Sequence, residues 1–322
     1  MGFRSVLAAA AALVALVVPA QADDAAYPTK PVRIVVGSSA GGTADTVSRL
    51  MAERLTAKFG QSFFVENMPG AGGALASTYV AKAAPDGYTL QFVFIGSHAI
   101  LPHLNKLEYD PIKDFAPVSL VSFSANLLLV NPAFGVKTVE ELIAKLKADP
   151  GKYDYGSGGL GGSQHLSTEI FLQATGTEAV HIPYQGSGQL LTALVAGDIP
   201  FALDTITTAV PHVQAGSLVA LAISSKERSQ LLPDVPTLAE TVPGFDVVAW
   251  NGFLAPAGTP PAIVDKLSAA AAEFLKTPEA QDYFNKLATT AVGSTPAEFG
   301  ALISGDFEKF GKVIETAKIT LQ

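Results

Sequence analysis

Short apolar segments alternate with amphipathic segments along most of the chain. The apolar segment Val32–Val36 predicts a buried strand, and a glycine-rich turn follows it. Beyond the turn, apolar side chains recur at three- and four-residue spacing, which is typical of one face of a helix. These side chains are Val47, Leu50, Met51 and Leu55. The pattern predicts a unit of strand, loop and helix.

The same unit recurs along the chain. Further strands are predicted at 63–65, 89–95, 127–130, 153–155, 179–182, 201–203 and 219–223. Helices are predicted at 75–84, 139–147, 166–174, 190–196 and 209–215. Short apolar strands that alternate with amphipathic helices favour parallel sheets covered on both faces. Because the number of predicted strands is larger than one sheet usually contains, the pattern predicts two α/β domains.

Two longer stretches of β-type sequence, 116–130 and 247–254, are expected to cross between the domains. Helices dominate after the second stretch, at 262–275, 279–287 and 299–317. This layout is expected of a two-lobed protein that closes about a hinge, although two unrelated domains in series remain the alternative. The predicted boundaries are 23–125 with 249–322 for lobe 1, and 126–248 for lobe 2.

The N-terminus has the features of a cleaved signal peptide, predicted at residues 1–22. A short basic segment, Met1–Arg4, precedes the apolar run Val6–Val18, and Ala20-Gln21-Ala22 has the small-x-small pattern of a cleavage site. The run is shorter than the roughly 20 residues of a membrane-spanning helix, which makes an anchor the weaker alternative. We therefore predict cleavage after Ala22 and a periplasmic location.

Composition and charge exclude several classes of protein, site and partner. The 322 residues are 48% hydrophobic and 16% charged, far from the composition of disordered chains. No cysteine is present, which excludes disulfides, thiolate metal sites and cysteine nucleophiles. The 21 basic and 29 acidic side chains give a net charge of −8, which argues against nucleic acid or an anionic membrane as a partner.

Two glycine-rich loops, 37–45 and 156–165, each connect a predicted strand to a predicted helix. A helix N-terminus presents unpaired N–H groups and partial positive charge, and glycine lets an anion approach them closely. Neither loop contains lysine or arginine. Amides and hydroxyls would therefore hold the ligand, which suits a carboxylate at least as well as a phosphate. The alternative for each loop is an ordinary turn with a helix cap.

Enzyme motifs are weak or absent. Gly156, Gly158 and Gly161 match the spacing of a dinucleotide fingerprint, but the next strand, 180–184, lacks the acid that would bind the ribose. We therefore expect no cofactor. The nucleophile elbow, the phosphate-binding lysine motif and the zinc motif HExxH do not occur, and the five histidines lack metal-ligand spacing. No metal site is expected.

A hydrolase stays open as an alternative, with Ser157 or Ser163 as nucleophile beside His165 and Asp204. Asp204 ends a predicted strand and opens a hydroxyl-rich turn, which is where ligands bind in open α/β sheets. Asp45 lies in the first turn of a predicted helix, where it complements the helix dipole, faces a ligand or orders the loop.

Several longer motifs extend over essentially the whole mature chain. They are Ala40-Gly41-Gly42-x-x-Asp45, Val65-Glu66-Asn67-x-Pro69-Gly70-Ala71-Gly72-Gly73, Ala81–Leu90, Tyr109-Asp110-Pro111-x-x-Asp114-Phe115-Ala116-Pro117, His181-Ile182-Pro183-Tyr184, Leu232–Thr237 and Ala255–Pro260. Together they resemble the Bug-type extracytoplasmic solute receptors of tripartite tricarboxylate transporters.

The resemblance implies a type II periplasmic binding protein fold of class α/β. Each lobe would be a mostly parallel sheet flanked by helices, and two extended hinge crossings would join the lobes. Such a protein is a monomer without catalytic activity that closes on a small organic acid and delivers it to the permease subunits of the transporter. A sensory receptor with the same fold remains an alternative.

The resemblance also implies a ligand site between the AGG loop of one lobe and a Ser/Gly/His-Leu loop of the other. Together with the reasoning from the residues, it assigns to the ligand Ser38, Ser39, Ala40, Gly41, Gly42, Asp45, Phe94, Ser97, Ser157, Gly158, Gly161, Gly162, Ser163, His165, Tyr184, Asp204, Thr205 and Thr208. Trp250, like Phe94, either walls this cleft or belongs to the core.

Two departures from the family pattern bear on the ligand. Relatives usually carry an aromatic residue and proline before AGG, where this chain has Ser38 and Ser39, and the turn after Asp204 is rich in threonine. The added room and hydroxyls favour a longer or aromatic carboxylate, such as terephthalate or a citrate-like acid.

Overall fold

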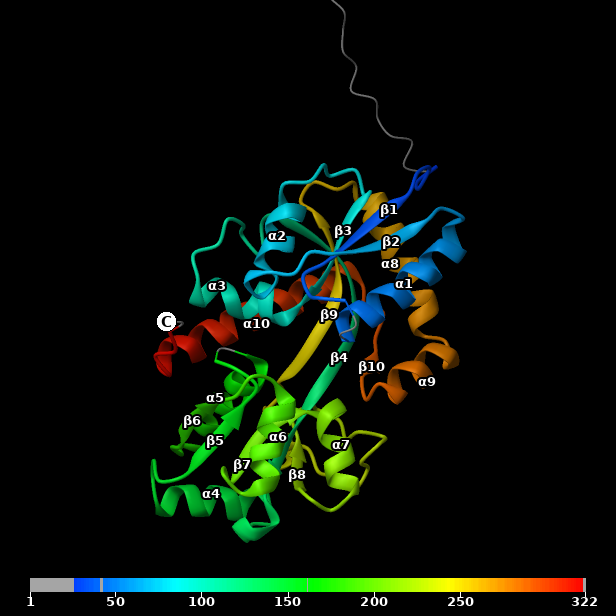
Figure 1. Cartoon of the computed structure of the whole chain (residues 1–322). Helices are drawn as coiled ribbons and strands as arrows, with labels where there is room; N and C mark the ends of the chain where they lie inside the picture. The colour runs from blue at the N-terminus through cyan, green and yellow to red at the C-terminus, as the bar shows by residue number, and fades with distance from the viewer. Residues whose placement is uncertain (1–25, 41–42, 161, 321–322) are drawn as a thin grey trace, which may run out of the picture.

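The computed structural model describes residues 26–40, 43–160 and 162–320 (Figure 1). The predicted signal peptide and its cleavage site lie outside these residues, as do Gly41, Gly42 and Gly161. Figure 1 shows an upper half and a lower half joined by two long strands, β4 (Phe115–Val130) and β9 (Val248–Pro256). These strands are the two crossings predicted from the sequence.

The upper half contains a sheet in the order β2-β1-β3-β9-β4, with β10 paired to the other edge of β4. Its remaining strands are β1 (Val32–Val36), β2 (Phe63–Asn67), β3 (Thr89–Phe94) and β10 (Thr290–Ala291). β1 pairs in parallel with β2 and with β3, whereas β9 runs antiparallel to β3 and to β4.

The lower half contains a sheet in which β4 pairs with β7 and β8, and β5 lies between β7 and β6. Its strands are β5 (Asp154–Ser157), β6 (Val180–Pro183), β7 (Phe201–Thr205) and β8 (Val219–Ile223). β5 is parallel to both neighbours, and β4 is antiparallel to β7 and β8. Among the described strands, every antiparallel pair thus includes β4 or β9, which makes the sheet mixed.

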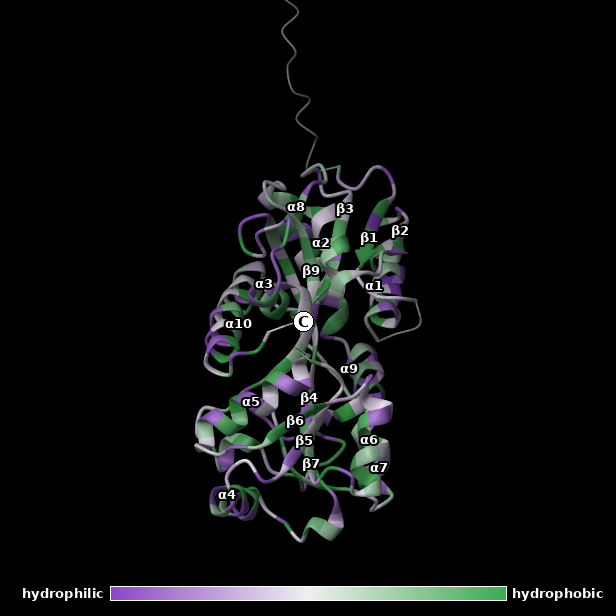
Figure 2. Ribbon diagram, turned by 60° about the vertical axis from the view of Figure 1, so that its left-hand side comes forward, coloured by the Kyte–Doolittle hydropathy of each residue, from purple (hydrophilic) through white to green (hydrophobic). Residues whose placement is uncertain are grey.

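Helices cover both faces of the sheets. They are α1 (Thr43–Phe59), α2 (Ala74–Ala81), α3 (Leu101–Leu104), α4 (Val139–Ala148), α5 (Ser163–Thr175), α6 (Ser187–Ala196), α7 (Ile206–Gln214), α8 (Pro261–Leu275), α9 (Pro278–Lys286) and α10 (Pro296–Thr316). In Figure 2 most of them carry hydrophobic and hydrophilic residues side by side, as amphipathic helices do. The predicted α/β fold class is confirmed.

Short polar motifs set the ends of several helices. Thr138 caps α4 by accepting a hydrogen bond from the amide of Glu141 at 3.2 Å, and Thr295 forms a reciprocal capping box with Glu298 at α10. α5 and α6 end at Gly176 and Gly197, both left-handed, a conformation that glycine adopts without steric cost.

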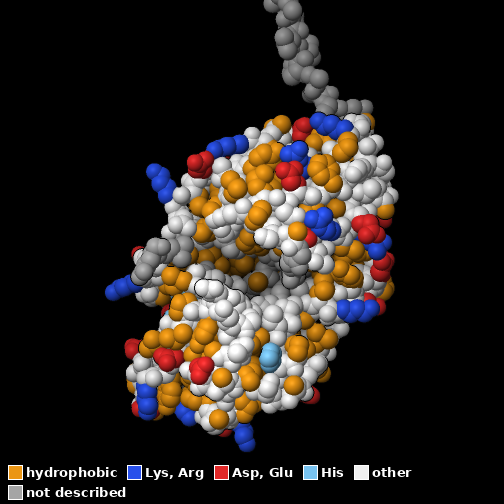
Figure 3. Space-filling view, viewed as in Figure 1, with side chains coloured by type: hydrophobic (Ala, Val, Ile, Leu, Met, Phe, Trp, Pro, Cys, Tyr) orange, Lys and Arg blue, Asp and Glu red, His pale blue; other side chains and the backbone are white. Residues whose placement is uncertain are grey.

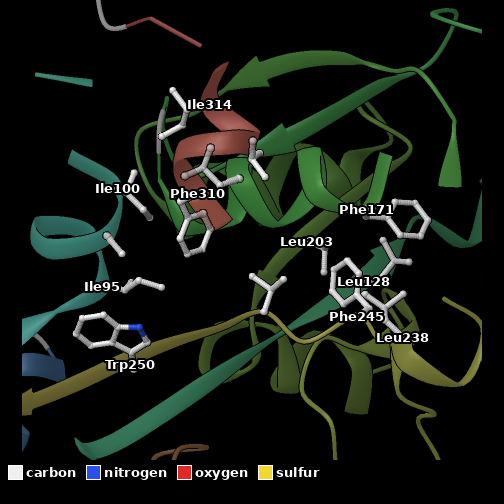
Figure 4. Close-up of a cluster of buried hydrophobic side chains, with 14 of the residues drawn as sticks. Ile95, Ile100, Leu128, Phe171, Leu203, Leu238, Phe245, Trp250, Phe310 and Ile314 are labelled. Carbon is white, nitrogen blue, oxygen red and sulfur yellow. The ribbon is translucent and has the colours of Figure 1, made fainter. Parts of the chain in front are cut away.

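The hydrophobic core continues from one half into the other. One cluster of buried side chains includes Trp250 in β9, Phe310 and Ile314 in α10, and Phe171 in α5 together with Leu203 in β7. Figure 4 shows these residues between the ribbons of the two halves. Two further clusters lie between the sheets and their other helices, α1 and α8 in the upper half and α6 and α7 in the lower half.

Two features differ from the predicted pattern. Between β3 and the following loop lies a π-helical turn, Gly96–Ile100, that continues into α3. The strand β10 has two residues, too few to leave a periodic pattern. In the part of the chain that the structure describes, no helix combines the length and the apolar character that a membrane span requires.

Candidate functional site

The candidate site is a hollow between the two halves of the molecule. Figure 3 shows this hollow at mid-height, and Figure 1 shows β1 running from the top of the molecule toward the lower half. The loops that follow β1 and β3 above, and β5 and β7 below, therefore approach each other across it. Loops at the carboxyl ends of parallel strands are where α/β proteins bind ligands.

In the upper half, the loop after β1 packs directly on the 3₁₀ turn Ala71–Gly73. A Cβ atom added to Gly37 would lie 2.9 Å from the Cα atom of Gly73, so the contact requires glycine. Gly73 in turn has φ of +91°, and a Cβ there would lie 2.8 Å from the Cζ atom of Phe94. The loop after β1, the turn Ala71–Gly73 and the end of β3 thus form one layer of backbone, which we call the glycine layer. The half-buried side chain of Phe94 packs against Gly73 in this layer.

Asp45 orders this layer. The residue is 4% exposed, and its carboxylate accepts hydrogen bonds from Arg49 Nε at 3.0 Å and from Asn67 Nδ2 at 2.9 Å. Asn67 Nδ2 also donates to the carbonyl of Ser38 at 3.0 Å. The bonds connect the loop after β1 to the end of β2, so the geometry favours the loop-ordering role for Asp45.

Ser97 lies beneath the layer and is fully buried. Its hydroxyl donates to the carbonyl of Phe94 at 3.1 Å, and its own carbonyl accepts a bond from the hydroxyl of Tyr109 at 2.5 Å. The neighbouring His98 is also fully buried, and burial lowers its pKa to about 3. These residues hold the π-helical turn in place.

In the lower half, Ser157 ends β5 and is fully buried. Its hydroxyl lies 2.7 Å from Nε2 of His181 and donates to the carbonyl of Gly159 at 3.0 Å. His181 stacks on His165 with ring centroids 3.7 Å apart and the rings 7° from parallel. Burial lowers the pKa of His165 to about 3 and that of His181 to about 4, so both rings are neutral at pH 7.

Asp204 connects the N-termini of three helices. Its buried carboxylate accepts hydrogen bonds from three side chains, one in the first turn of each helix. The donors are Gln164 Nε2 of α5 at 3.2 Å, Ser187 Oγ of α6 at 2.6 Å and Thr208 Oγ1 of α7 at 2.8 Å. Three helix N-termini that converge produce a region suited to an anion.

The glycines of the lower loop allow it to pack against the start of α6. Gly186 donates its amide to the carbonyl of Gly158 at 3.0 Å, and the amide of Tyr184 donates to the carbonyl of Ser157 at 2.9 Å. Gly162 precedes α5, and Ser163 begins it. The structure thus places the described members of the predicted set in two groups, an upper group after β1 and β3 and a lower group after β5, β6 and β7.

The polar contacts involve residues that were not predicted as site residues from the sequence. Asn67, Gln164 and Ser187 hold the two aspartates, and the only pattern that could have indicated Ser187 is its place before a predicted helix. Trp250 is fully buried and donates Nε1–H to Asp306 at 2.8 Å, so it belongs to the core rather than to the hollow.

Two of the residues proposed for a hydrolase, Ser157 and Asp204, make their described side-chain hydrogen bonds to other partners. Ser157 pairs with His181 instead of His165, and the three donors to Asp204 include no histidine. Within the described ranges, no group of three or more His, Asp or Glu side chains is arranged to hold a metal ion.

The chain is similar to proteins of one family over most of its length. The family described as tripartite tricarboxylate transporter family receptor matches residues 47–319. A protein from the TAR-I ttuE-ttuC' intergenic region of Agrobacterium vitis is 37% identical, over 95% of this chain and 90% of its own. Protein BugT of Bordetella pertussis is 33% identical, over 92% of this chain and 91% of its own.

Solved structures agree with this similarity. A Rhodopseudomonas palustris protein solved with adipate is 35% identical, with a TM-score of 0.75 over 91% of this chain and 99% of that chain. MatC of the same organism, solved with malate, is 34% identical, with a TM-score of 0.72 over 89% and 100%. The periplasmic binding protein BugD is 30% identical, with a TM-score of 0.71 over 92% and 100%.

Proposed function

Because the chain belongs to the tripartite tricarboxylate transporter receptor family, we propose that this solute-binding protein captures a small organic acid between its two halves. The observation that carries the proposal is the convergence of α5, α6 and α7 at Asp204, opposite the glycine layer of the upper half. Helix N-termini and glycine backbone supply N–H donors to a carboxylate without any lysine or arginine in the loops.

The two aspartates act through other residues. Asp45 and Asp204 are buried and already accept several hydrogen bonds, so they position the loops, as do Ser97, Ser157 and His165. The ligand is then contacted by the backbone amides and side chains of the remaining predicted residues. These are Ser38, Ser39, Ala40, Gly41, Gly42, Phe94, Gly158, Gly161, Gly162, Ser163, Tyr184, Thr205 and Thr208. The lobes meet at the boundaries 125/126 and 248/249, with β4 and β9 as the hinge.

The ligand proposed is a dicarboxylate or a longer or aromatic carboxylate. Structures of relatives contain adipate and malate, which are dicarboxylates. Ser38 and Ser39 occupy the place where relatives carry an aromatic residue and proline, and this leaves room in the upper loop. We propose further that the mature chain begins at Asp23 in the periplasm and acts as a monomer that delivers its ligand, chemically unchanged, to the membrane permease.

A thermal-shift experiment tests this function. The chain from Asp23 is heated with adipate, malate, citrate or terephthalate, and each compound is then analysed for chemical change. A ligand that binds the folded state raises the melting temperature with the logarithm of its concentration. We expect such a shift with unchanged ligand. A shift accompanied by conversion would indicate an enzyme, and no shift with any of the four acids would contradict the proposal.

A pair of variants locates the site. Ser163→Ala removes one hydroxyl at the start of α5, and we expect affinity for the bound acid to fall about fivefold, as for one lost hydrogen bond of about 1 kcal/mol. Ser304→Ala removes a hydroxyl of similar partial burial from α10 and serves as the control. Equal affinities of the two variants, measured by calorimetry, would place the ligand elsewhere.

A further inference from the structure

Three polar side chains on the crossing strand β4 have buried atoms without a partner. Ser122, Ser124 and Asn126 are 0%, 8% and 1% exposed. Within the part of the chain that the structure describes, Ser122 Oγ, Ser124 Oγ and Asn126 Oδ1 form no hydrogen bond. A buried polar group that lacks a partner is costly, so native proteins contain few of them. A group of them at positions 122–126 of one strand therefore indicates that something else satisfies them.

The three side chains form a row on one face of β4, the strand that passes from the upper to the lower half (Figure 1). Side chains alternate between the two faces of a strand, so positions 122, 124 and 126 project to the same face. Neighbouring members are about 7 Å apart along the strand, which makes the row about 13 Å long. We call Ser122, Ser124 and Asn126 the polar row.

Strand register connects the polar row to the candidate site in both halves. Ser122 is opposite Asn251 of β9, and Asn251 is opposite Phe94 of β3. Asn126 is opposite Thr205 of β7. Residues directly opposite each other in an antiparallel pair lie on the same face of the sheet. The row therefore shares its face with Phe94 of the upper half and Thr205 of the lower half, which are both proposed ligand contacts.

The chemistry of the polar row fits hydroxyl groups. The side-chain amide of Asn126 donates from Nδ2 to Ser167 Oγ at 3.0 Å, and the remaining oxygen, Oδ1, can only accept a hydrogen bond. A serine hydroxyl both donates and accepts. At pH 7 a carboxylate has no proton to donate to Asn126, whereas an alcohol has one. A ligand that satisfies the whole row therefore carries hydroxyls along its length.

We propose that the polar row belongs to the ligand site and that the acid bound there carries several hydroxyl groups along its chain, as a sugar acid does. This inference rests on the function proposed above and names its substrate class. A carboxylate of the ligand binds at the helix N-termini, and its hydroxyls bond to the row. Because the atoms of the row are shielded from solvent, an analogue without hydroxyls leaves them unpaired and is bound more weakly.

Two acids of equal length separate this inference from the proposed function. Galactarate is the adipate chain with a hydroxyl on each internal carbon. Calorimetry on the chain from Asp23 should show that galactarate binds more tightly than adipate by at least about tenfold. Adipate that binds as tightly as galactarate, or more tightly, would overturn the role of the row and leave the proposed function standing. If these two acids, malate, citrate and terephthalate all fail to bind, the proposed function itself fails.

A pair of serine variants locates the preference. Ser124→Ala removes a hydroxyl without a partner, so it should leave the free energy of unfolding unchanged or raise it. It should also reduce the preference for galactarate over adipate about fivefold, as for one lost hydrogen bond. Ser119→Ala on the same strand is the matched control, because Ser119 is fully buried and donates to the carbonyl of Ser294 at 2.8 Å.

The control should lose stability, measured by urea denaturation, and keep the preference for galactarate. An unchanged preference in Ser124→Ala would show that the row holds structural water only, and would overturn its role in binding. An equal loss of preference in Ser124→Ala and Ser119→Ala would also overturn that role, because the loss would then follow from a general change in β4.

Discussion

Asp204 shows how one buried carboxylate can organise the proposed binding surface. A carboxylate without a cation nearby is costly to bury unless hydrogen bonds compensate. Here Gln164, Ser187 and Thr208 all donate to it, and each belongs to a different helix. Its role is therefore to hold three helix N-termini in one place, and its side chain is not available to a ligand.

Asp204→Asn tests this role. An amide nitrogen replaces an oxygen that accepts hydrogen bonds, so the free energy of unfolding should fall by about 1–3 kcal/mol. Affinity for the bound acid should fall as well, because the helix N-termini lose their common partner. Urea denaturation and calorimetry measure the two effects. Asp198→Asn, at an exposed position before β7, is the control, and equal stability of the two variants would refute the positioning role.

The stacked histidines make the lower half sensitive to acid. Burial lowers the pKa of His165 and His181 below the value in the unfolded chain, so the unfolded state binds more protons in acid. Their contribution to stability is complete above about pH 6.5 and is lost as pH falls toward 4 and 3. Glu169 lies close to this pair and accepts a hydrogen bond from Tyr155. Burial raises the pKa of Glu169 above its value in the unfolded chain. Its contribution to stability therefore has the opposite sign and grows as the pH falls toward the unfolded pKa.

Two measurements isolate the histidines. NMR titration should show the His181 ring half protonated only near pH 4 and the His165 ring only near pH 3. In urea denaturation, His165→Phe should lose less stability than the parent chain between pH 6.5 and pH 4, since it keeps a ring in the stack but binds no proton. Imidazole resonances that titrate near pH 6.5 would contradict the assignment.

At the scale of elements, close packing between β5 and α6 brings the end of β5 and the start of α6 together. A Cβ atom on Gly156 in β5 would collide with the side chains of Leu190 in α6 and Ile199. Glycine therefore allows α6 to lie close to β5, and a larger residue would force the ends of these two side chains to shift. This contact brings the start of α6, with Ser187, to the end of β5.

Two glycine substitutions separate this contact from general glycine effects. Gly156→Ala should destabilise the protein by about 1–3 kcal/mol, because the added methyl group overpacks the interface. Gly188→Ala in α6 meets no atom within 4 Å and should stabilise the protein by about 0.5–1 kcal/mol through the better helix propensity of alanine. Thermal unfolding of both variants checks the signs, and a neutral Gly156→Ala would show that α6 can shift away from β5.

At the scale of the molecule, α10 joins the two halves. Phe310 is fully buried in the cluster that also contains Trp250 in β9 and Phe171 in α5 (Figure 4). Gln173 of α5 also donates to the carbonyl of Val313 at 3.5 Å. The halves therefore share packing energy, and the chain should unfold as one cooperative unit.

Phe310→Ala should lower stability by about 3–5 kcal/mol and separate the unfolding of the halves into two calorimetric transitions. Phe284→Ala removes an equally buried ring from the cluster formed by α1, α8 and α9, which lies in the upper half alone. This control should lose similar stability without separating the halves. A single transition in both variants would show that the shared cluster does not couple them.

Elements with a strong local pattern were predictable from the sequence. The strand expected at 219–223 is β8 at those residues, and the crossings expected at 116–130 and 247–254 are β4 and β9. Hydrophobic periodicity is a property of neighbouring residues, so it determines helices, strands and their alternation. The π-helical turn Gly96–Ile100 and the two-residue β10 lack such a pattern, and packing produces them.

The sequence by itself determined the α/β class, the two glycine-rich loops and their lack of cationic side chains. Only the tertiary structure decided which side chains meet. Ser157 pairs with His181, 24 residues away, and Asp204 binds Gln164, 40 residues away. These contacts depend on the order of strands and the packing of helices, which long-range burial sets and local spacing does not encode.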